Sequence, residues 1–348
     1  MLRATSLGRR GGMGAEGDKG GKVAAPPSNN RLWATAVLCV VTMGVLWGSI
    51  SPRRVGSGAR LTPEVCRGVE MLEVCSHRAA ASTELEGVED CSLEAVRALW
   101  GRNVSCFDVD FVMTSDDHLM TAHPDILGSA LGEAVGWDPE ARSFHELRGA
   151  LARRGRRPQE GSFPEAKDII ALFAELRADG TGRDAAVFLD VKGRGMSEEG
   201  LQALASAVRA GDAARWSAVW FLPETLHLST RLAALLPEIK LIWGQKDRRP
   251  APGGDFEPVP GDPRDMNDET LRGYDIIGPS MKLSSEFLDA AKNSGRPVLG
   301  WVVDDEAGLI KAAKHGMRYV VSNYPLRNMK ALGELRRRCR VAREGAVG

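Results

Sequence analysis

Short apolar runs recur along the chain from residue 69 to residue 323, and stretches with the periodicity of amphipathic helices separate most of them. Strands of a parallel sheet that is covered by helices are buried on both faces, so they are continuously apolar rather than alternating. Repeated strand–helix units of this kind predict an α/β fold around a parallel sheet. The eight runs are residues 69–77, 106–113, 186–192, 218–223, 240–244, 275–279, 298–303 and 319–323.

Eight such units are the number that a (β/α)₈ barrel, the TIM-barrel fold, requires over ~250 residues. Residues 66–340 provide this length, and residues 341–348 remain as a C-terminal tail. The competing arrangement is an open doubly wound sheet, but no glycine-rich phosphate-binding sequence follows the first run. Helices with an apolar face are predicted at residues 93–100, 199–210, 226–236, 285–294 and 306–315.

Residues 247–265 interrupt the rhythm, because they are dense in Pro, Gly and Asp and therefore predict a loop. In a barrel, a loop that follows a strand lies at the rim where functional groups gather. This loop either shapes access to a site or is a surface insertion.

The N-terminal part contains a candidate membrane anchor. Residues 32–50 are nineteen residues without a charge, a length that nearly crosses a hydrocarbon core. Residues 1–31 form a basic tail before this segment, and residues 51–65 form a linker after it. The pattern favours a single-pass anchor with the barrel in a lumen or outside the cell. The alternatives are a cleaved signal peptide and, because the first residues are rich in Arg, a plastid or mitochondrial transit peptide.

Charge and cysteine content exclude some functions. Lys plus Arg and Asp plus Glu both number 46, so no broad basic field exists to attract nucleic acid. Six cysteines occur without a CxxC pair, which argues against a structural zinc site or a thioredoxin-like motif. Cys66, Cys75, Cys91 and Cys106 either form disulfides in an oxidising compartment or remain buried thiols.

The run at residues 106–113 contains two acidic residues, Asp108 and Asp110. Strand residues two positions apart lie on the same face, about 6.6 Å from each other. Two buried carboxylates at that distance raise each other's pKa, and the loss of water adds to the cost, unless a cation or several donors neutralise them. The pattern therefore predicts a positive charge at this site.

Functional groups of a barrel gather at the carboxyl ends of its strands, and the third run places Asp190 there. Asp108, Asp110 and Asp190 together would present hard oxygen ligands, which suit Mg²⁺ or Ca²⁺ better than zinc. We therefore expect one divalent cation among these three carboxylates.

The same strand ends carry basic side chains. His77 ends the first run and Arg78 follows it, Lys192 ends the third run, and His123 comes after the second. A metal ion with Arg78 and Lys192 would clamp a phosphate, and the two imidazoles could move protons in a displacement at phosphorus. Each residue alone has a structural explanation as a cap, a turn or a surface salt bridge. Their gathering at successive strand ends favours a site.

Several of these motifs resemble a known family. Three of the motifs are His77-Arg78-Ala79 at the end of the first run, Asp108-Val109-Asp110 in the second and Asp190-Val191-Lys192 in the third. Residues 89–91, 114–117, 123–124 and 298–325 carry further motifs. These motifs are similar to those of the glycerophosphodiester phosphodiesterase family. The three motifs in or at the runs correspond, in order, to its His-Arg-Gly, Glu-x-Asp and Glu-x-Lys motifs. The four further segments correspond, in order, to its Glu-Asn-Thr motif, its Thr-x-Asp-Gly motif, its His-Asp motif and its closing segment from Trp-Thr-Val-Asn to Thr-Asp-x-Pro. The resemblance covers most of residues 73–327.

The resemblance implies a metal-dependent enzyme that hydrolyses glycerophosphodiesters to glycerol 3-phosphate and an alcohol. By motif correspondence, the implied residues are Asp108, Asp110 and Asp190 as ligands of one Mg²⁺ or Ca²⁺, His77 and His123 as the acid and base, Arg78 and Lys192 on the phosphate, and Trp301 in the pocket wall.

The chain departs from the family pattern at two metal ligands. Asp108 and Asp190 stand where the family has glutamates, so the ion would sit deeper or have another radius. Related barrels of the sphingomyelinase D type accept an aspartate as third ligand. A sphingomyelinase D- or lysophospholipase D-like enzyme that acts on lysophospholipids is therefore one alternative, and a non-catalytic, membrane-tethered barrel is the other.

Overall fold

Eight parallel strands form a ring at the centre of the structure. The computed structural model describes residues 61–133, 138, 141–155, 161–179, 183–192, 198–222, 225–250, 256–259 and 261–344. The strands follow one another around the ring in chain order as β1 (Glu73–Ser76), β2 (Cys106–Met113), β4 (Ala186–Val191), β5 (Ser217–Phe221), β6 (Lys240–Gln245), β9 (Ile276–Pro279), β10 (Leu299–Trp301) and β11 (Tyr319–Ser322).

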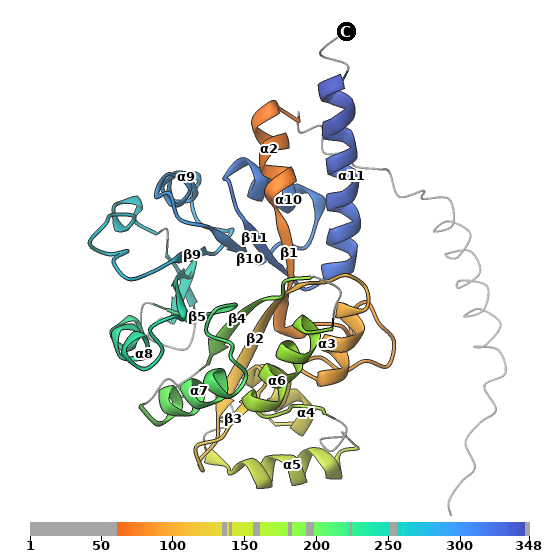
Figure 1. Ribbon diagram of the computed structural model, residues 1–348, viewed down its shortest axis with the longest axis vertical. Coiled ribbons are helices and arrows are strands. Elements are labelled where there is room, and N and C mark those ends of the chain that lie inside the picture. The colour runs from red at the N-terminus through yellow and green to blue at the C-terminus, as the bar shows by residue number, and fades with distance from the viewer. Residues whose placement is uncertain are drawn as a thin grey trace, which may run out of the picture. The chain divides into compact units, whose positions relative to one another are not determined.

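The ring closes on itself. β11 pairs in parallel with β1, and parallel bridges from Ile277 to Val298 and from Ser280 to Trp301 join β9 to β10. Each strand therefore has a neighbour on both sides, as a barrel requires and an open sheet does not. The predicted (β/α)₈ barrel is confirmed (Figure 1).

Helices connect the strands and surround the ring (Figure 1). They are α2 (Pro63–Met71), α3 (Leu93–Trp100), α4 (Pro124–Leu131), α5 (Phe144–Arg153), α6 (Ala166–Arg177), α7 (Glu198–Ala210), α8 (Ser229–Leu235), α9 (Ser285–Asn293), α10 (Glu306–Lys314) and α11 (Pro325–Glu344), with short 3₁₀ turns η1 (His77–Ala79), η5 (Leu226–Leu228) and η6 (Pro263–Asp265). All five helices predicted from the sequence are present, the third of them as η5 followed by α8. Hydroxyl caps define several of the starts, for example Ser92 at α3 and Ser284 at α9.

One strand prediction was wrong at its beginning. The run at residues 69–77 was expected to be strand throughout, but its first residues belong to α2 and β1 begins at Glu73. Thr62 caps α2 and Pro63 occupies its first turn, so the helix starts within the segment 51–65 that the pattern assigned to a linker. Apolar residues at a buried helix end cannot be told from a buried strand by hydrophobicity alone.

The barrel interior is filled by side chains from every strand of the ring. Inward-facing residues form one cluster: Cys75, Cys106, Phe188, Ala218, Trp220, Ile242, Ile276, Leu299 and Val321. Along β2 the alternate residues Phe107, Val109 and Phe111 pack in a different cluster, against the helices. Because Cys106 faces inward, Asp108 and Asp110 face inward as well, one and two layers further toward the carboxyl end.

Two disulfides cross-link the described part of the chain. Cys75 of β1 bonds to Cys106 of β2, and Cys66 of α2 bonds to Cys339 of α11. The second bond joins the first and the last helix of the described chain, which run side by side (Figure 1). Cys91 is buried and unbonded. Some cysteines thus form disulfides and one remains a buried thiol, which were the two alternatives considered from the sequence. Cys339 was not among the cysteines expected to pair.

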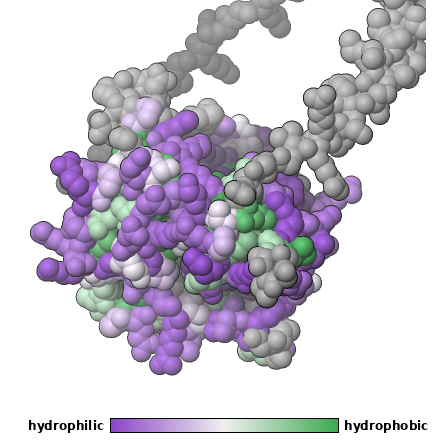
Figure 2. Space-filling model, turned by 90° about the horizontal axis from the view of Figure 1, so that it is seen from above, coloured by the Kyte–Doolittle hydropathy of each residue, from purple (hydrophilic) through white to green (hydrophobic). Residues whose placement is uncertain are grey.

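The predicted anchor at residues 32–50 and the tail at residues 1–31 lie outside the described residues and stay predictions. Within the part that the structure describes, no helix is both long and apolar enough to cross a bilayer. On the face shown in Figure 2, hydrophilic residues dominate and hydrophobic ones occur in scattered groups. Met71 and Val341 are the large hydrophobic residues exposed in the described ranges.

The loop predicted at residues 247–265 contains a small hairpin. β7 (Arg248–Pro250) pairs antiparallel with β8 (Phe256–Pro258), directly after β6. Its position at the carboxyl end of a barrel strand is as expected and is common to both alternatives considered for this segment.

Candidate active site

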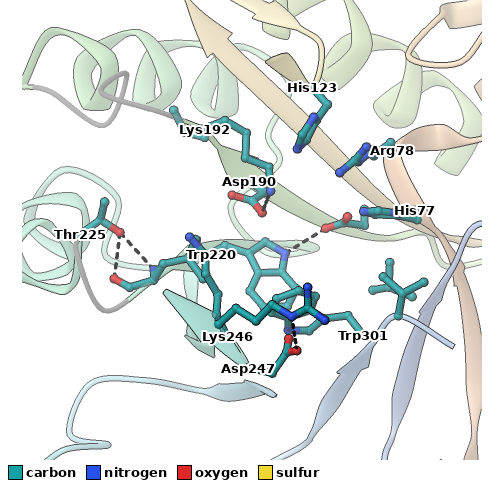
Figure 3. Close-up of a pocket in the computed structure, with 16 residues that line it drawn as sticks. His77, Arg78, His123, Asp190, Lys192, Trp220, Thr225, Lys246, Asp247 and Trp301 are labelled. Atoms are coloured by element: carbon teal, nitrogen blue, oxygen red, sulfur yellow. Dashed lines mark hydrogen bonds and ion pairs between the residues drawn. The ribbon is translucent and has the colours of Figure 1, made fainter. Parts of the chain in front are cut away.

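A cavity of about 620 Å³ opens at the carboxyl ends of the strands (Figure 3). Seven of the eight residues predicted from the sequence lie in its wall: His77, Arg78, Asp108, His123, Asp190, Lys192 and Trp301. The eighth, Asp110, is fully buried beside them. The structure therefore brings the predicted residues together, while their chemical roles remain predictions.

The three carboxylates come from adjacent strands. Asp110 of β2 lies opposite Asp190 of β4 in the parallel register, and Asp108 lies two residues before Asp110. Asp108 Oδ1 accepts a hydrogen bond of 3.0 Å from Trp220 Nε1. Burial, followed by the charges of Asp110 and Asp190, raises the pKa of Asp108 well above its usual value. The raised pKa that the sequence pattern predicted for neighbouring buried carboxylates is thus found at Asp108.

Two basic side chains of the chain itself neutralise these carboxylates. Arg78 Nε lies 3.2 Å from Asp110 Oδ2, and Lys192 Nζ lies 3.1 Å from Asp110 Oδ1. Lys192 also bonds to Asp190 Oδ2. Burial opposes the charge on Lys192, but Asp110 and Asp190 outweigh it and raise the pKa of the ammonium above its usual value.

The local turn after β1 aims Arg78 at this group. Arg78 and Ala79 have φ values of 59° and 47°, in the left-handed region that favours glycine. The motif that the sequence resembles has a glycine at the second of these positions; here Ala79 takes a positive φ while fully buried. Residues held in this region are commonly found where a site requires a particular side-chain direction.

The donor set fits a hard divalent cation by its chemistry, because three carboxylates offer only oxygen. Both Asp110 oxygens are buried and lack a hydrogen-bond partner of standard geometry, so they depend on the charges of Arg78 and Lys192. As the side chains stand, no three His, Cys, Asp or Glu residues of the described ranges converge on one ion position. An ion could bind these oxygens if Lys192 released its contacts with Asp110 and Asp190.

Hydrogen bonds fix the tautomer of His77. Asp304 Oδ1 accepts from the Asn323 backbone N–H and Asp304 Oδ2 accepts from Asn323 Nδ2, each at 2.8 Å. The amide oxygen of Asn323 must therefore face His77 Nδ1, which lies 2.6 Å from it. Nδ1 donates this bond, and Nε2 is left as the proton-accepting nitrogen. Burial and the charge of Arg78 lower the pKa of His77, which favours the neutral ring.

His123 is held in the opposite tautomer. It is the N-cap residue of α4, and its Nδ1 accepts a bond of 3.2 Å from the backbone N–H of Asp125. A backbone N–H can only donate, so the ring proton belongs on Nε2. Burial, together with Arg78 and Lys192, lowers the pKa of His123 to about 3. The two imidazoles thus differ: His77 has an accepting Nε2 and His123 a donating one.

Sequence reasoning missed several residues of the site. Asn323 and Asp304 position His77, and Trp220 bonds to Asp108 and meets Trp301 edge-on at a centroid distance of 6.3 Å. Asn323 and Asp304 lie inside the motif segment at residues 298–325, so the sequence analysis included them but assigned them no role. Trp220 lies one residue before the end of β5 and Trp301 ends β10, so a Trp near a strand end was a comparable signal.

No protein-family model and no curated protein sequence matches the chain. Solved structures match its fold. A glycerophosphodiester phosphodiesterase from Parabacteroides distasonis has a TM-score of 0.56 at 14% identity, over 76% of this chain and 97% of that one. A phosphodiesterase from Oleispira antarctica, solved with its product sn-glycerol-3-phosphate, has a TM-score of 0.56 at 16% identity, over 75% of this chain and 96% of that one. This similarity establishes the barrel fold.

Proposed function

We propose that the chain is a phosphodiesterase that hydrolyses glycerophosphodiesters to glycerol 3-phosphate and an alcohol. The observation that carries the proposal is the pair of oppositely polarised imidazoles beside Arg78 and Lys192 in one cavity. Structures of the same fold are named for this activity, and one holds glycerol 3-phosphate. Both facts support the same chemistry that the sequence motifs imply.

The side chains suggest a division of labour. His77 Nε2 would take a proton from the attacking water, and His123, charged as the imidazolium in the complex, would give its Nε2 proton to the oxygen of the departing alcohol and be left neutral. Arg78 would bind the phosphoryl oxygens and stabilise the charge that grows on them. The anionic diester would also raise the pKa of His123, because a nearby negative charge favours the imidazolium.

A divalent cation, Mg²⁺ or Ca²⁺, belongs to the proposal. Asp108, Asp110 and Asp190 would hold it, and it would supply Lewis-acid stabilisation of the phosphoryl group. Lys192, displaced from two of these carboxylates, would then be available to the phosphate. At two ligand positions aspartate is shorter than the glutamate of the family, so the experiments below use both ions.

We expect exhaustive chelation to abolish turnover and Ca²⁺ or Mg²⁺ to restore it. Calorimetric titration with each ion provides a readout without substrate, and Asp110→Asn should weaken the binding by at least about tenfold. Unchanged turnover after chelation, with no heat of ion binding, would show that Arg78 and Lys192 alone neutralise the carboxylates.

A lysophospholipid is the second candidate substrate class. Leu222, Val302 and Val321 line the cavity together with Trp220 and Trp301, so part of its wall suits an apolar group. Assays against a panel of glycerophosphodiesters and lysophospholipids, each with Ca²⁺ and with Mg²⁺, distinguish the two classes. Binding of glycerol 3-phosphate without hydrolysis of any diester would instead favour a non-catalytic barrel. The predicted N-terminal anchor would suit a membrane-derived substrate.

Substitution of Asn323 should shift the pH profile in a direction that depends on the new residue. The hydrogen bond from His77 to Asn323 raises the pKa of His77, although burial keeps that pKa below its ordinary value of 6.5. The proposal requires neutral His77, so we expect the acidic limb of kcat/KM of the wild type below the ordinary imidazole pKa. Asn323→Ala should move this limb to lower pH and reduce kcat about 100-fold through misorientation.

The reciprocal variant is Asn323→Asp, because a carboxylate beside Nδ1 favours the imidazolium and should move the limb to higher pH. Profiles measured from pH 4 to 9 test both signs. An identical limb in all three proteins would show that Asn323 does not act on the ionisation of His77.

A further inference from the structure

One sequence motif at the amino-terminal end of the barrel has no part in the phosphate chemistry. Asn103-Val104-Ser105 has the form Asn-x-Ser, which is an acceptor sequence for N-linked glycans. The chain contains seven asparagines, and only Asn103 has Ser or Thr two positions after it. Asn103 lies in the turn between α3, which ends at Trp100, and β2, which begins at Cys106.

This turn holds the Asn103 side chain at the surface. Asn103 is exposed and has a φ of 67°, in the left-handed region that Asn tolerates better than most residues. The end of α3 fixes the turn, because the Asn103 backbone N–H donates to the Trp100 carbonyl at 3.0 Å. The amide oxygen accepts a bond of 3.4 Å from Arg183 Nη1. Within the described ranges the amide nitrogen, the atom that would carry a glycan, has no hydrogen-bond partner.

A hollow beside the turn leaves room for a first sugar. It has a volume of about 350 Å³ and is lined by Asn103 and Ser105 together with residues of α2, β1 and α11. Because Asn103 precedes β2, it lies at the amino ends of the strands, whereas the cavity with His77 and His123 opens at their carboxyl ends. A glycan on Asn103 would therefore leave the cavity accessible.

The two disulfides are an independent reason to expect this modification. The bond between Cys75 and Cys106 is buried inside the barrel, and the bond between Cys66 and Cys339 joins α2 to α11. Disulfides persist in oxidising compartments such as the lumen of the endoplasmic reticulum and are rare in the cytosol. Proteins that pass through this lumen are the ones that receive N-linked glycans.

We infer that Asn103 carries an N-linked glycan. The donor is of the class of oligosaccharides joined to a lipid through a diphosphate. Asn103 Nδ2 loses one proton and forms a bond to the anomeric carbon of the first sugar. The bond from that carbon to the diphosphate oxygen breaks, and the lipid diphosphate leaves with its electron pair.

The fold also indicates when the glycan is added. Val104, the middle residue of the motif, is fully buried, and its backbone N–H donates to the Leu99 carbonyl at 3.1 Å. A transferase has to bind all three residues of the motif, so it acts before α3 and β2 have packed. The addition therefore precedes folding, and the fraction of chains that are modified does not depend on the stability of the folded barrel.

The test is translation of the full chain in the presence of microsomal membranes, followed by a peptide N-glycosidase. The wild type should give one product of higher mass that requires the membranes and loses its extra mass on treatment. Protease added outside the microsomes should leave the barrel intact. Mass spectrometry should find an aspartate at position 103 after the treatment, because the glycosidase deamidates the asparagine that it releases. Asn103→Gln should lose the heavier product.

Two substitutions of Ser105 test the motif without changing the acceptor. Ser105→Ala removes the hydroxyl that the motif requires and should lose the heavier product, whereas Ser105→Thr keeps a hydroxyl and should retain it. Asn293→Gln is the matched control, since Asn293 is exposed at the end of α9 and lacks the motif. This control should retain the heavier product.

Two results would overturn the inference. The first is a wild type without the heavier product, whether or not its barrel is protected from the protease. The second is a heavier product that persists in both Asn103→Gln and Ser105→Ala, because another residue then carries the glycan. Neither result depends on turnover, so the inference stands or falls separately from the proposed function.

Discussion

Replacing His77 by alanine should reduce the release of glycerol 3-phosphate from glycerophosphodiesters by about 10³-fold or more while leaving the fold intact. General-base catalysis typically contributes about 10² to 10⁴. His77 is the imidazole whose accepting nitrogen is defined by a side-chain network, through Asn323 and Asp304. Its loss leaves the attacking water without a positioned proton acceptor. The loss should appear in kcat, because the proposed phosphate ligands Arg78 and Lys192 are retained.

The measurement is steady-state kinetics on a glycerophosphodiester that the wild type accepts, with thermal unfolding of each protein. His145→Ala is the matched control, since His145 lies exposed on α5 and does not line the cavity. Retention of most wild-type activity by His77→Ala, with the midpoint of unfolding unchanged, would remove the proposed general base and with it the division of labour between the two imidazoles.

Replacing Lys192 by methionine should cost both stability and activity. Lys192 contacts two carboxylates, one of which, Asp110, is completely buried. Removing one partner of a buried ion pair leaves an uncompensated charge and typically costs about 3–5 kcal/mol. Arg78 remains beside Asp110, so we expect the lower part of that range in the free energy of unfolding, measured by urea denaturation. Turnover should fall as well, because Lys192 is a proposed phosphate ligand.

Two further variants separate these effects. Lys167 forms an ion pair with Glu165 at the surface, and Lys167→Met should cost less than about 1 kcal/mol. Adding Asp110→Asn to Lys192→Met removes the buried charge of Asp110 and restores the net charge of the group, so it should recover part of the stability but not turnover. A Lys192→Met protein as stable as the wild type would mean that Asp110 is neutral or solvated without Lys192.

The strands that the sequence predicted best are those buried on both faces with polar boundaries. β2 has the predicted bounds because every residue from Cys106 to Met113 is apolar or faces the barrel interior. The first strand was extended too far because the apolar end of α2 leads directly into it, separated by Leu72 alone. The signal that distinguishes them, Thr62 followed by Pro63, is a helix-start signal rather than a hydrophobic one.

The candidate site was predictable where neighbouring strands supply it and unpredictable where distant segments meet. Asp108, Asp110, Asp190 and Lys192 follow from strand alternation and the carboxyl-end rule. The contact of His77 with Asn323 joins residues 246 positions apart, and no local periodicity reports such a contact. The predicted positive charge among the carboxylates was correct, but the side chains that supply it in the structure are Arg78 and Lys192.

The bond between Cys66 and Cys339 turns nearly the whole barrel into a covalent loop, with a sequence separation of 273 residues. A protease that cuts one peptide bond anywhere inside this loop, such as in the segment between β7 and β8, produces two chains that stay attached to each other. The cleaved protein therefore keeps its full mass until a reductant is added. If the protein tolerates such a cut, loops can be replaced or exchanged without separating the two halves of the barrel.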